Sequence, residues 1–406
     1  MTKKISEHIK LYSRDLKGKV EKIRGYKTRN IGISIIVLCK DEERCIKRCL
    51  DAIMDEIGFN DEVIVIDTGS TDKTLEIIMN QKYFSRIRIL KKKWAENFSE
   101  IRNHGLSSSK KEWIFFIDAD EIIEKGSIAN LKSNLQEINL LNLDIVCCPA
   151  IINIEGRHVV QTVRRIIPNT VKIKYYGKIH EEPKYVESGK PCDFIAFDNV
   201  ILHHDGYTES VILEKNKQQR NITLLASVIE EEPENSRWFY LYSRDGKGLI
   251  DNDLYEESLL KAIRLGENLD EFEEYKIRAL SDLIEYYLSQ GNIEKANSIF
   301  ENLKATEVGL SDVLFWEITI NLIITEYNQI SFIEKIIKYK NEHTEVEYGS
   351  LNSNGFHLDY LLSKLFFNIR EYEKSFSILS KLENIGFGNY KKDYSLLEKS
   401  LEKYLG

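Results

Sequence analysis

IFFIDADEII, at residues 114–123, joins an apolar run to a cluster of carboxylates. From Trp113 to Ile117 all side chains are aromatic or β-branched, which predicts a strand that is buried on both faces. Residues two apart in an extended segment point to the same side, so Asp118 and Asp120 are expected to project together from the carboxyl end of this strand. That end is where open α/β sheets bind their ligands.

Two convergent carboxylates with Glu121 beside them are typical of a site for a hard divalent cation, Mg²⁺ or Mn²⁺, that shares phosphate oxygens with a substrate. The alternative is an acidic turn that contacts only solvent. For an isolated D-x-D that plainer interpretation would be preferred. Here the sequence before the motif favours the metal site.

The composition of the 406-residue chain is that of an ordinary globular protein with two or three domains. A net charge of −8 argues against duplex nucleic acid as a partner. No apolar run approaches the roughly 20 residues that span a bilayer, and the N-terminus has no secretory signal, so we expect a cytoplasmic protein without stable membrane insertion. The six cysteines lack disulfide or zinc spacing, which predicts reduced, buried thiols.

Strands and helices alternate over about 90 residues from Ile31, which predicts a parallel sheet. The expected strands before the acidic motif are 33–38, 62–66 and 87–90, with helices between them. After the motif we expect a helix at 127–139 and a strand at 144–154. We then expect two paired strands, 159–167 and 171–176, about a Pro168-Asn169 turn, a polar loop at 177–183 and a strand at 199–202.

Three regions follow: an N-terminal arm at 1–30 with loosely helical spacing, an α/β domain at 31–212 and an all-α domain at 213–406. The arm would pack on the body of the protein or on a second subunit, or else form a partly ordered extension. In the all-α region a short motif recurs at 255–258, 293–296 and 372–375. An apolar residue, two polar residues and a small residue near a period of about 34–40 are typical of tetratricopeptide-like hairpins. A generic amphipathic bundle is the alternative.

Polar side chains also follow the earlier strands. Asp67 ends the second strand and can accept hydrogen bonds from a base or a ribose, while Lys40 and Glu42 follow the first strand. Arg102 and Asn103 precede the acidic strand and could reach a pyrimidine or a phosphate. Together with the D-x-D these residues predict a nucleotide-diphosphate pocket. The chain has no G-x-G-x-x-G or G-x-x-x-x-G-K-[ST], which disfavours dinucleotides and a phosphate-binding loop.

The ordered motifs CKDEE, VIVIDTGSTDKT and WIFFIDADEII resemble family 2 glycosyltransferases with the GT-A fold. The resemblance implies that Asp67 holds the uracil and that the D-x-D binds a metal on the sugar-nucleotide diphosphate. Where many members of that family carry the motif P-T-Y-N-E-E after the first strand, this chain reads LCKDEE at 38–43. Backbone contacts with the nucleotide are still expected there, but no role is assigned to the Cys39 side chain. A Q-x-x-R-W motif is absent, which disfavours processive polysaccharide synthesis. The resemblance assigns the nucleotide contacts to Leu38, Lys40, Glu42, Asp67, Arg102, Asn103, Asp118 and Ala119.

A closer resemblance is to the sublancin-type bacteriocin (glycocin) glycosyltransferases, which attach a sugar to a Cys or Ser of a peptide. It is carried by the segments at 94–103, 164–165, 177–183 (GKIHEEP) and 204–207, together with the helical-repeat tail. Single-transfer enzymes of lipopolysaccharide core assembly share the H-E and later His elements. The acceptor, a bacteriocin precursor peptide or else a glycan, therefore stays open.

The resemblance implies an inverting, metal-dependent transfer from a UDP-sugar, usually UDP-glucose, in which charge builds on the leaving diphosphate. Asp120 would hold the Mg²⁺ or Mn²⁺, with Asp118 on ribose or metal and His204 as the candidate third ligand. His203, on the opposite face of its strand, is expected to be structural. By the same alternation only one of Arg164 and Arg165 can face the site.

The general base would be Glu181 or Glu182, oriented or assisted by His180. The helical tail would bind the acceptor peptide or a second subunit, and the latter would make a homodimer. A different class of function is a helical-repeat scaffold that binds peptides beside an inactive transferase domain. The intact D-A-D and H-E-E-P motifs argue against that alternative.

Overall fold

The computed structural model describes residues 9–11, 31–139, 145–153, 158–204, 210–267, 273–306, 310–342 and 354–387. The chain forms two compact units, Met1–Tyr275 and Lys276–Gly406. The first unit contains the sheet and the helices that follow it up to α8. The domain limits expected from the sequence, 31–212 and 213–406, remain a prediction.

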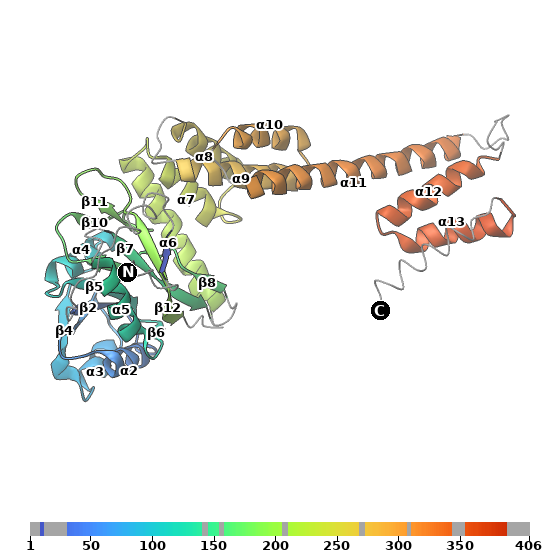
Figure 1. The fold of residues 1–406 in the computed structure, drawn as a ribbon. Coiled ribbons are helices and arrows are strands. Elements are labelled where there is room, and N and C mark those ends of the chain that lie inside the picture. The colour runs from blue at the N-terminus through green and yellow to red at the C-terminus, as the bar shows by residue number, and fades with distance from the viewer. Residues whose placement is uncertain are drawn as a thin grey trace, which may run out of the picture. The chain divides into compact units, whose positions relative to one another are not determined.

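A ten-stranded mixed sheet organises the described part of the first unit (Figure 1). Its order is β1-β12-β7-β9-β5-β2-β3-β4, with β6 paired to β12 and β8 to β7. The strands are β1 (Ile9–Leu11), β2 (Ile33–Cys39), β3 (Glu62–Asp67), β4 (Ile87–Lys91), β5 (Trp113–Asp118), β6 (Glu121–Ile123), β7 (Val146–Asn153), β8 (His158–Val160), β9 (Ile166–Pro168) and β12 (Phe194–His204).

The predicted parallel arrangement of the first strands is confirmed. Strand β2 runs parallel to β3 on one side and to β5 on the other. The register places Leu38 opposite Asp118 and Cys39 opposite Asp67, so the three strands end level with one another. The residues that follow these strands therefore meet at one edge of the sheet.

Both faces of the central strands are buried, as the apolar run in β5 predicts. On one face, side chains such as Phe115 pack with helices α2 (Ile46–Glu56) and α5 (Ser127–Asn139). On the other face, Phe116 packs against Ile101 of α4 (Phe98–Ser108). Helix α4 begins there because the side chain of Asn97 accepts the backbone N–H of Glu100 at 3.0 Å. Short helices α3 (Thr74–Met79) and η1 (Phe84–Arg86) complete this half of the unit.

The predicted strand pair about Pro168-Asn169 is wrong. Strand β9 instead pairs with β5 and β7 within the main sheet, and β10 (Ile173–Tyr176) pairs with β11 (Glu182–Tyr185) in a separate two-stranded sheet. Asn169 anchors the end of β9, since its side-chain amide donates to the Lys111 carbonyl at 2.8 Å. The expected polar loop at 177–183 is shorter than predicted, because Glu182 and Pro183 already belong to β11.

The N-terminal arm lies mostly outside the described residues. Its described part, Ile9–Leu11, is a strand that pairs antiparallel with β12, so the loosely helical spacing predicts the wrong structure at these positions. Backbone pairing with β12 attaches this part of the arm to the main sheet.

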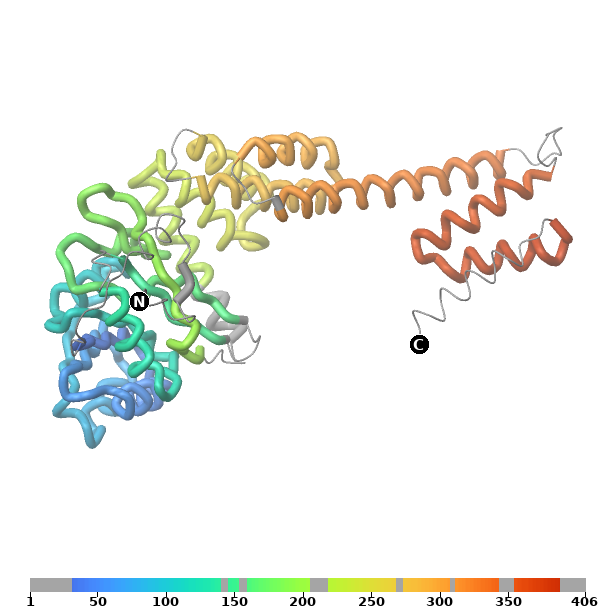
Figure 2. Tube along the Cα trace, in the orientation of Figure 1, coloured from blue at the N-terminus to red at the C-terminus, as the bar shows by residue number. Residues whose placement is uncertain are grey.

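Helices make up the rest of the described chain (Figure 2). In the first unit these are α6 (Ser210–Glu231), α7 (Ser236–Gly246) and α8 (Asn252–Leu265), and α9 (Glu273–Ser289) crosses into the second. The second unit continues with α10 (Ile293–Lys304), α11 (Leu310–Glu342), α12 (Phe356–Asn368) and α13 (Tyr372–Asn384).

The predicted helical repeat marks the starts of α8, α10 and α13, and its small residues Ser258, Ala296 and Ser375 are all buried. Within the described residues, no helix is long and apolar enough to cross a membrane.

Gly105 offers a test of how closely α4 packs on the sheet. A Cβ at Gly105 would lie 2.9 Å from Cδ1 of Ile36 and 3.2 Å from Cε1 of Phe116. We expect Gly105→Val to lower the free energy of unfolding by about 2 kcal/mol, because the added methyl groups overpack the core. Urea titration would measure this. Gly58→Val is the control, since a Cβ at Gly58 meets nothing closer than 3.5 Å. Equal losses in both variants would contradict the close packing.

Candidate functional site

A cavity of about 530 Å³ lies at the carboxyl ends of β2, β3 and β5, the edge at which α/β sheets bind ligands. Its volume falls within the range of about 300–1,000 Å³ typical of small-molecule sites. Most of the residues predicted for nucleotide binding and catalysis meet here. Those that line the cavity are Leu38, Lys40, Glu42, Arg102, Asp118, Ala119, Asp120, His180 and Glu181.

The remaining predicted site residues lie outside the cavity lining. The buried Asp67 follows β3, and its Oδ1 accepts the Ser70 N–H at 3.1 Å. The side chain of Asn103 donates to the carbonyl of Tyr175 and accepts from its N–H, each at 2.8 Å, which ties α4 to β10. The other two residues outside the lining are Glu182 and His204.

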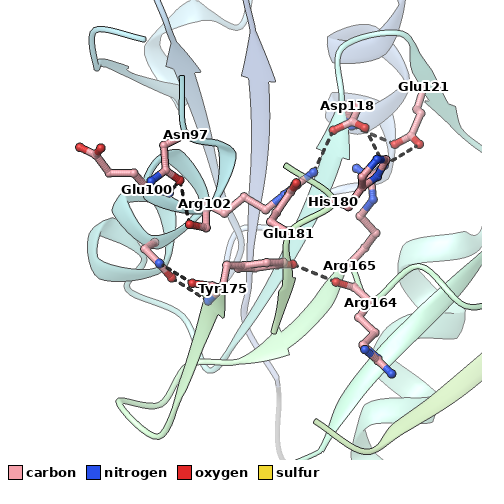
Figure 3. A network of polar contacts seen from close by, with 12 residues as sticks. Asn97, Glu100, Arg102, Asp118, Glu121, Arg164, Arg165, Tyr175, His180 and Glu181 are labelled. Carbon is pink, nitrogen blue, oxygen red and sulfur yellow. Dashed lines mark hydrogen bonds and ion pairs between the residues drawn. The ribbon is translucent and has the colours of Figure 1, made fainter. Parts of the chain in front are cut away.

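Two buried arginines hold the Asp118 carboxylate (Figure 3). Arg165 Nη2 donates to Asp118 Oδ2 at 2.6 Å, and Arg102 Nη2 lies 3.7 Å from Oδ1. Desolvation by the surrounding protein would raise the pKa of the Asp118 carboxyl, but the charges of Arg165 and Arg102 outweigh it and hold that pKa well below its usual range. Asp118 is therefore ionised and already paired within the protein.

Glu121 points into the protein, so it is not placed to act as a third ligand of a cation. Its side chain is buried, its Oε2 accepts the Asp118 N–H at 2.8 Å, and Arg165 Nη2 lies 3.3 Å from its Oε1. Burial raises the pKa of the Glu121 carboxyl to about 7, against the opposing charge of Arg165 and with a further contribution from the charge of Asp118. Glu121 thus supports the Asp118–Arg165 pair from behind.

Asp120 and His204 are the residues that could hold a divalent cation. Strand β6 pairs with β12 so that His204 lies opposite Glu121, which brings His204 Nδ1 to 3.8 Å from Asp120 Oδ1. The neighbouring His203 instead contacts Glu124, with Nε2 2.7 Å from Oε2. The two histidines thus have different partners, as their alternation along the strand predicts.

The Asp120–His204 pair fits a cation that is shared with a substrate. Within the described ranges, no group of three His, Cys, Asp or Glu side chains could hold a metal ion by itself. Mg²⁺ is commonly held by one or two carboxylates together with substrate phosphates, and imidazole is a suitable ligand of Mn²⁺. A carboxylate beside an imidazole is therefore a sufficient protein contribution when a diphosphate supplies the other ligands.

The loop at 177–181 is fixed to helix α7. Gly177 has φ 101°, and a Cβ there would lie 2.8 Å from Trp238. His180 has φ 49°, a left-handed conformation, and its carbonyl accepts a hydrogen bond from Arg237. Its ring Nε2 lies 2.6 Å from Asp245 Oδ2. Helix α7 therefore determines where His180 stands in the cavity wall.

Arginines engage both glutamates of the H-E-E-P motif. Glu181 accepts a hydrogen bond from Arg102 Nε. Glu182 accepts from Arg164 Nη1 at 3.1 Å, and Arg237 Nη1 lies 3.0 Å from its other oxygen. Of the two glutamates, only Glu181 lines the cavity.

Several lining residues had no role assigned from the sequence. Trp94 and Phe98 pack edge to face with ring centroids 4.6 Å apart, and the Arg220 guanidinium lies 5.4 Å from the Phe98 centroid. The bacteriocin-type motif already contained the two aromatic residues, but no motif marks Arg220 or Asn221 of α6, which lie in the region assigned to the all-α domain. The further lining residues are Cys39, Thr68, Ile101 and Ile179.

Residues 34–204 match the family described as glycosyl transferase family 2. The SPbeta prophage-derived glycosyltransferase SunS of Bacillus subtilis is 29% identical over 367 residues, which cover 89% of this chain and 83% of that protein. A TPR repeat-containing protein of Synechococcus elongatus is 26% identical over 54% of this chain and 52% of its own length. A solved structure of S. aureus TarS 1–349 in complex with UDP-GlcNAc covers 68% of this chain and 92% of that chain, at 13% identity and a TM-score of 0.41.

The two carboxylates of the D-x-D are expected to differ in their effect on stability. Asp118→Asn should lower the free energy of unfolding by about 2 kcal/mol, because it leaves the buried Arg102 and Arg165 without their shared anion. Asp120→Asn should change it by less than about 0.5 kcal/mol, since Asp120 is partly exposed and lies 3.8 Å from His204 Nδ1, beyond hydrogen-bond distance. Denaturant titration of both variants would measure the difference. Similar stabilities would contradict the assigned structural role of Asp118.

Substitutions at Gly177 and Gly189 would separate the effect of backbone strain from the effect of packing against α7. Both have positive φ, 101° and 69°, but a Cβ at Gly189 meets nothing within 4 Å. We expect Gly177→Ala to displace the 177–181 loop and to lower the rate of sugar transfer at least about 10-fold, because it would misplace His180 and Glu181, which the sequence predicts to be catalytic. Gly189→Ala should retain turnover. Steady-state kinetics on the two variants would show whether the Trp238 contact matters.

Proposed function

We propose that the protein, whose residues 34–204 match glycosyl transferase family 2, transfers a hexose from a UDP-sugar to a Cys or Ser side chain of a bacteriocin precursor peptide. UDP-glucose is the first donor to test. The observation that carries the proposal is the Asp120–His204 pair beside a cavity into which three parallel strands direct their carboxyl ends. In the proposal, this pair binds a cation beside a space whose volume is typical of small-molecule sites.

In the proposed complex the nucleoside lies along Leu38, Lys40 and Glu42, with Asp67 supporting the adjoining turn. The diphosphate lies toward Asp120 and His204, which would hold the Mg²⁺ or Mn²⁺. A bound cation would stabilise the negative charge that develops on the departing UDP. Among the lining residues, Lys40 and Arg220 are further cations that a diphosphate could approach.

The transfer itself is a single displacement with inversion at C1 of the sugar. A lone pair of the acceptor sulfur or oxygen forms the new bond to C1, while the electron pair of the breaking C1–O bond goes to the β-phosphate oxygen of UDP. The acceptor must approach from the side opposite the diphosphate. In the proposal, His180 and Glu181 line that side of the cavity and receive the acceptor.

The peptide acceptor is supported by two features of the chain. The bacteriocin-type motifs at 94–103 and 177–183 contribute Trp94, Phe98, His180 and Glu181 to the cavity wall. The similarity to glycosyltransferase SunS extends over 89% of the chain and so includes helices beyond the matched family segment. Helical repeats often present extended surfaces to peptides.

The adjacent histidines of β12 provide a matched pair for testing the metal site. His204→Ala should weaken UDP binding in the presence of Mn²⁺ at least about 10-fold, because the cation loses one of its two protein ligands. His203→Ala should bind UDP as the wild type does, because His203 contacts Glu124 instead. Titration calorimetry with and without Mn²⁺ would measure both.

The transfer is tested by mass spectrometry after incubation with UDP-glucose, other UDP-sugars, Mn²⁺ and a bacteriocin precursor peptide. The proposal expects a mass gain of one or more hexoses that is lost in Asp120→Asn. Exchange of the acceptor Cys for Ser in the peptide shows which side chain is used. An unmodified peptide together with hydrolysis of the UDP-sugar would overturn the peptide acceptor and leave the sugar-nucleotide site standing.

A further inference from the structure

Asp245, near the end of α7, contacts the ring of His180 from outside the matched family segment. The Asp245 side chain is 11% exposed, and its Oδ2 lies 2.6 Å from His180 Nε2. Arg244 donates to the other oxygen of Asp245 from Nε at 2.9 Å and from Nη2 at 2.7 Å. Because Arg244 holds one oxygen of the Asp245 carboxylate, the other oxygen is fixed in place and can orient the His180 ring.

The contacts determine the tautomer of His180. Arg244 Nη2 lies 3.0 Å from Nε2 of His180, but Nε2 cannot accept from Arg244 and donate to Asp245 at the same time. The shorter contact assigns the Nε2 proton to Asp245. Burial would raise the pKa of the Asp245 carboxyl, but the hydrogen bond and charge of His180 and the charge of Arg244 hold it below its usual value. With the Nε2 proton directed to Asp245, Nδ1 carries the lone pair of the ring, and Arg244 Nη2 lies 3.4 Å from it.

The alternative bases are less suited to accept a proton. Glu181 is bonded to Arg102, and Glu182 lies between Arg164 and Arg237 outside the cavity lining. Both carboxylates are thus already engaged by arginine N–H groups. Imidazole is the side chain whose ordinary pKa of about 6.5 suits proton transfer near neutrality, which favours His180.

We propose that Asp245 is a positioning residue that holds His180 as the general base for the acceptor. The proposal rests on the glycosyl transfer proposed above. As the acceptor sulfur or oxygen bonds to C1, its proton passes to Nδ1 of His180, and UDP leaves with the electron pair of the C1–O bond. The left-handed backbone at His180, held by Arg237, fixes the ring in the cavity wall.

The groups that face His180 set the direction of its pH dependence. From α7 these are Asp245 and Arg244 at the ring and Arg237 at the carbonyl. From α6, Asn221 contacts the same Asp245 oxygen at 3.5 Å and lines the cavity with Arg220, and Glu181 is adjacent in the chain. Asp245→Asn removes the negative charge beside the ring and keeps the size of the side chain.

The test compares Asp245→Asn with the control variant Asp253→Asn. Asp253 is an exposed aspartate on α8. The rate is measured from pH 5 to 9 with UDP-glucose, Mn²⁺ and precursor peptides that carry a single acceptor Ser or Cys. We expect Asp245→Asn to lower kcat on the Ser peptide about 100-fold and to change the pH profile of that rate, because Asp245 no longer directs the Nε2 proton of His180. The loss should be smaller on the Cys peptide, because a thiol with a pKa of about 8.5 needs less help. The KM for UDP-glucose should be unchanged.

His180→Asn is the second variant, and Asn tolerates the left-handed backbone at this position. It should abolish the pH-dependent rise on the Ser peptide while UDP binding remains, which keeps the test decisive if Asp245→Asn does not fold. Transfer by Asp245→Asn with the wild-type pH profile would overturn the positioning role alone. Absence of transfer by the wild type to either peptide would overturn the proposed function and, with it, this inference.

Discussion

The ion pair between Asp118 and Arg165 is the interaction on which the candidate site depends. A carboxylate at the end of a buried strand remains ionised only when cations compensate for its loss of water. Arg165, just before β9, and Arg102 of α4 supply those charges from two other parts of the chain. The cluster therefore joins β5, β9 and α4 at the cavity, and Glu121 supports it through the Asp118 N–H.

Two further arginines, the buried Arg237 and the partly buried Arg164, hold the loop that carries His180. Arg237 of α7 reaches the His180 carbonyl and Glu182, while Arg164 holds the other oxygen of Glu182. These contacts stabilise a left-handed histidine that would otherwise cost roughly 1–2 kcal/mol. Since α6 and α7 also contribute to the cavity wall and its support, the matched family segment alone does not contain the whole site.

The sequence predicts the strands and the position of the acidic motif because both depend on local patterns. Short continuous apolar runs, separated by helical segments, define β2, β3 and β5. Because these strands pair in parallel, their carboxyl ends meet at one edge of the sheet. The motifs mark Arg102 and Arg165 as residues of interest, but they do not predict that both pair with Asp118, and they do not mark Asp245 at all. Arg165 and Asp245 lie 47 and 65 residues from the groups that they contact. The misassigned pairing of β10 has the same origin, since adjacent strands in the chain joined different sheets.

The charges around the cavity explain why the two carboxylates of one short motif act differently. Asp118, Glu121 and Glu181 face Arg102 and Arg165, so the cluster carries no net charge when Glu121 is protonated and one negative charge when it is ionised. Such a cluster offers no attraction to an anionic diphosphate. Asp120, whose neighbour is His204, adds a further negative charge to the wall. In the proposed complex, a diphosphate could approach this wall only if cations outweigh that charge, and Lys40, Arg220 and the divalent ion proposed for Asp120 and His204 would together supply it.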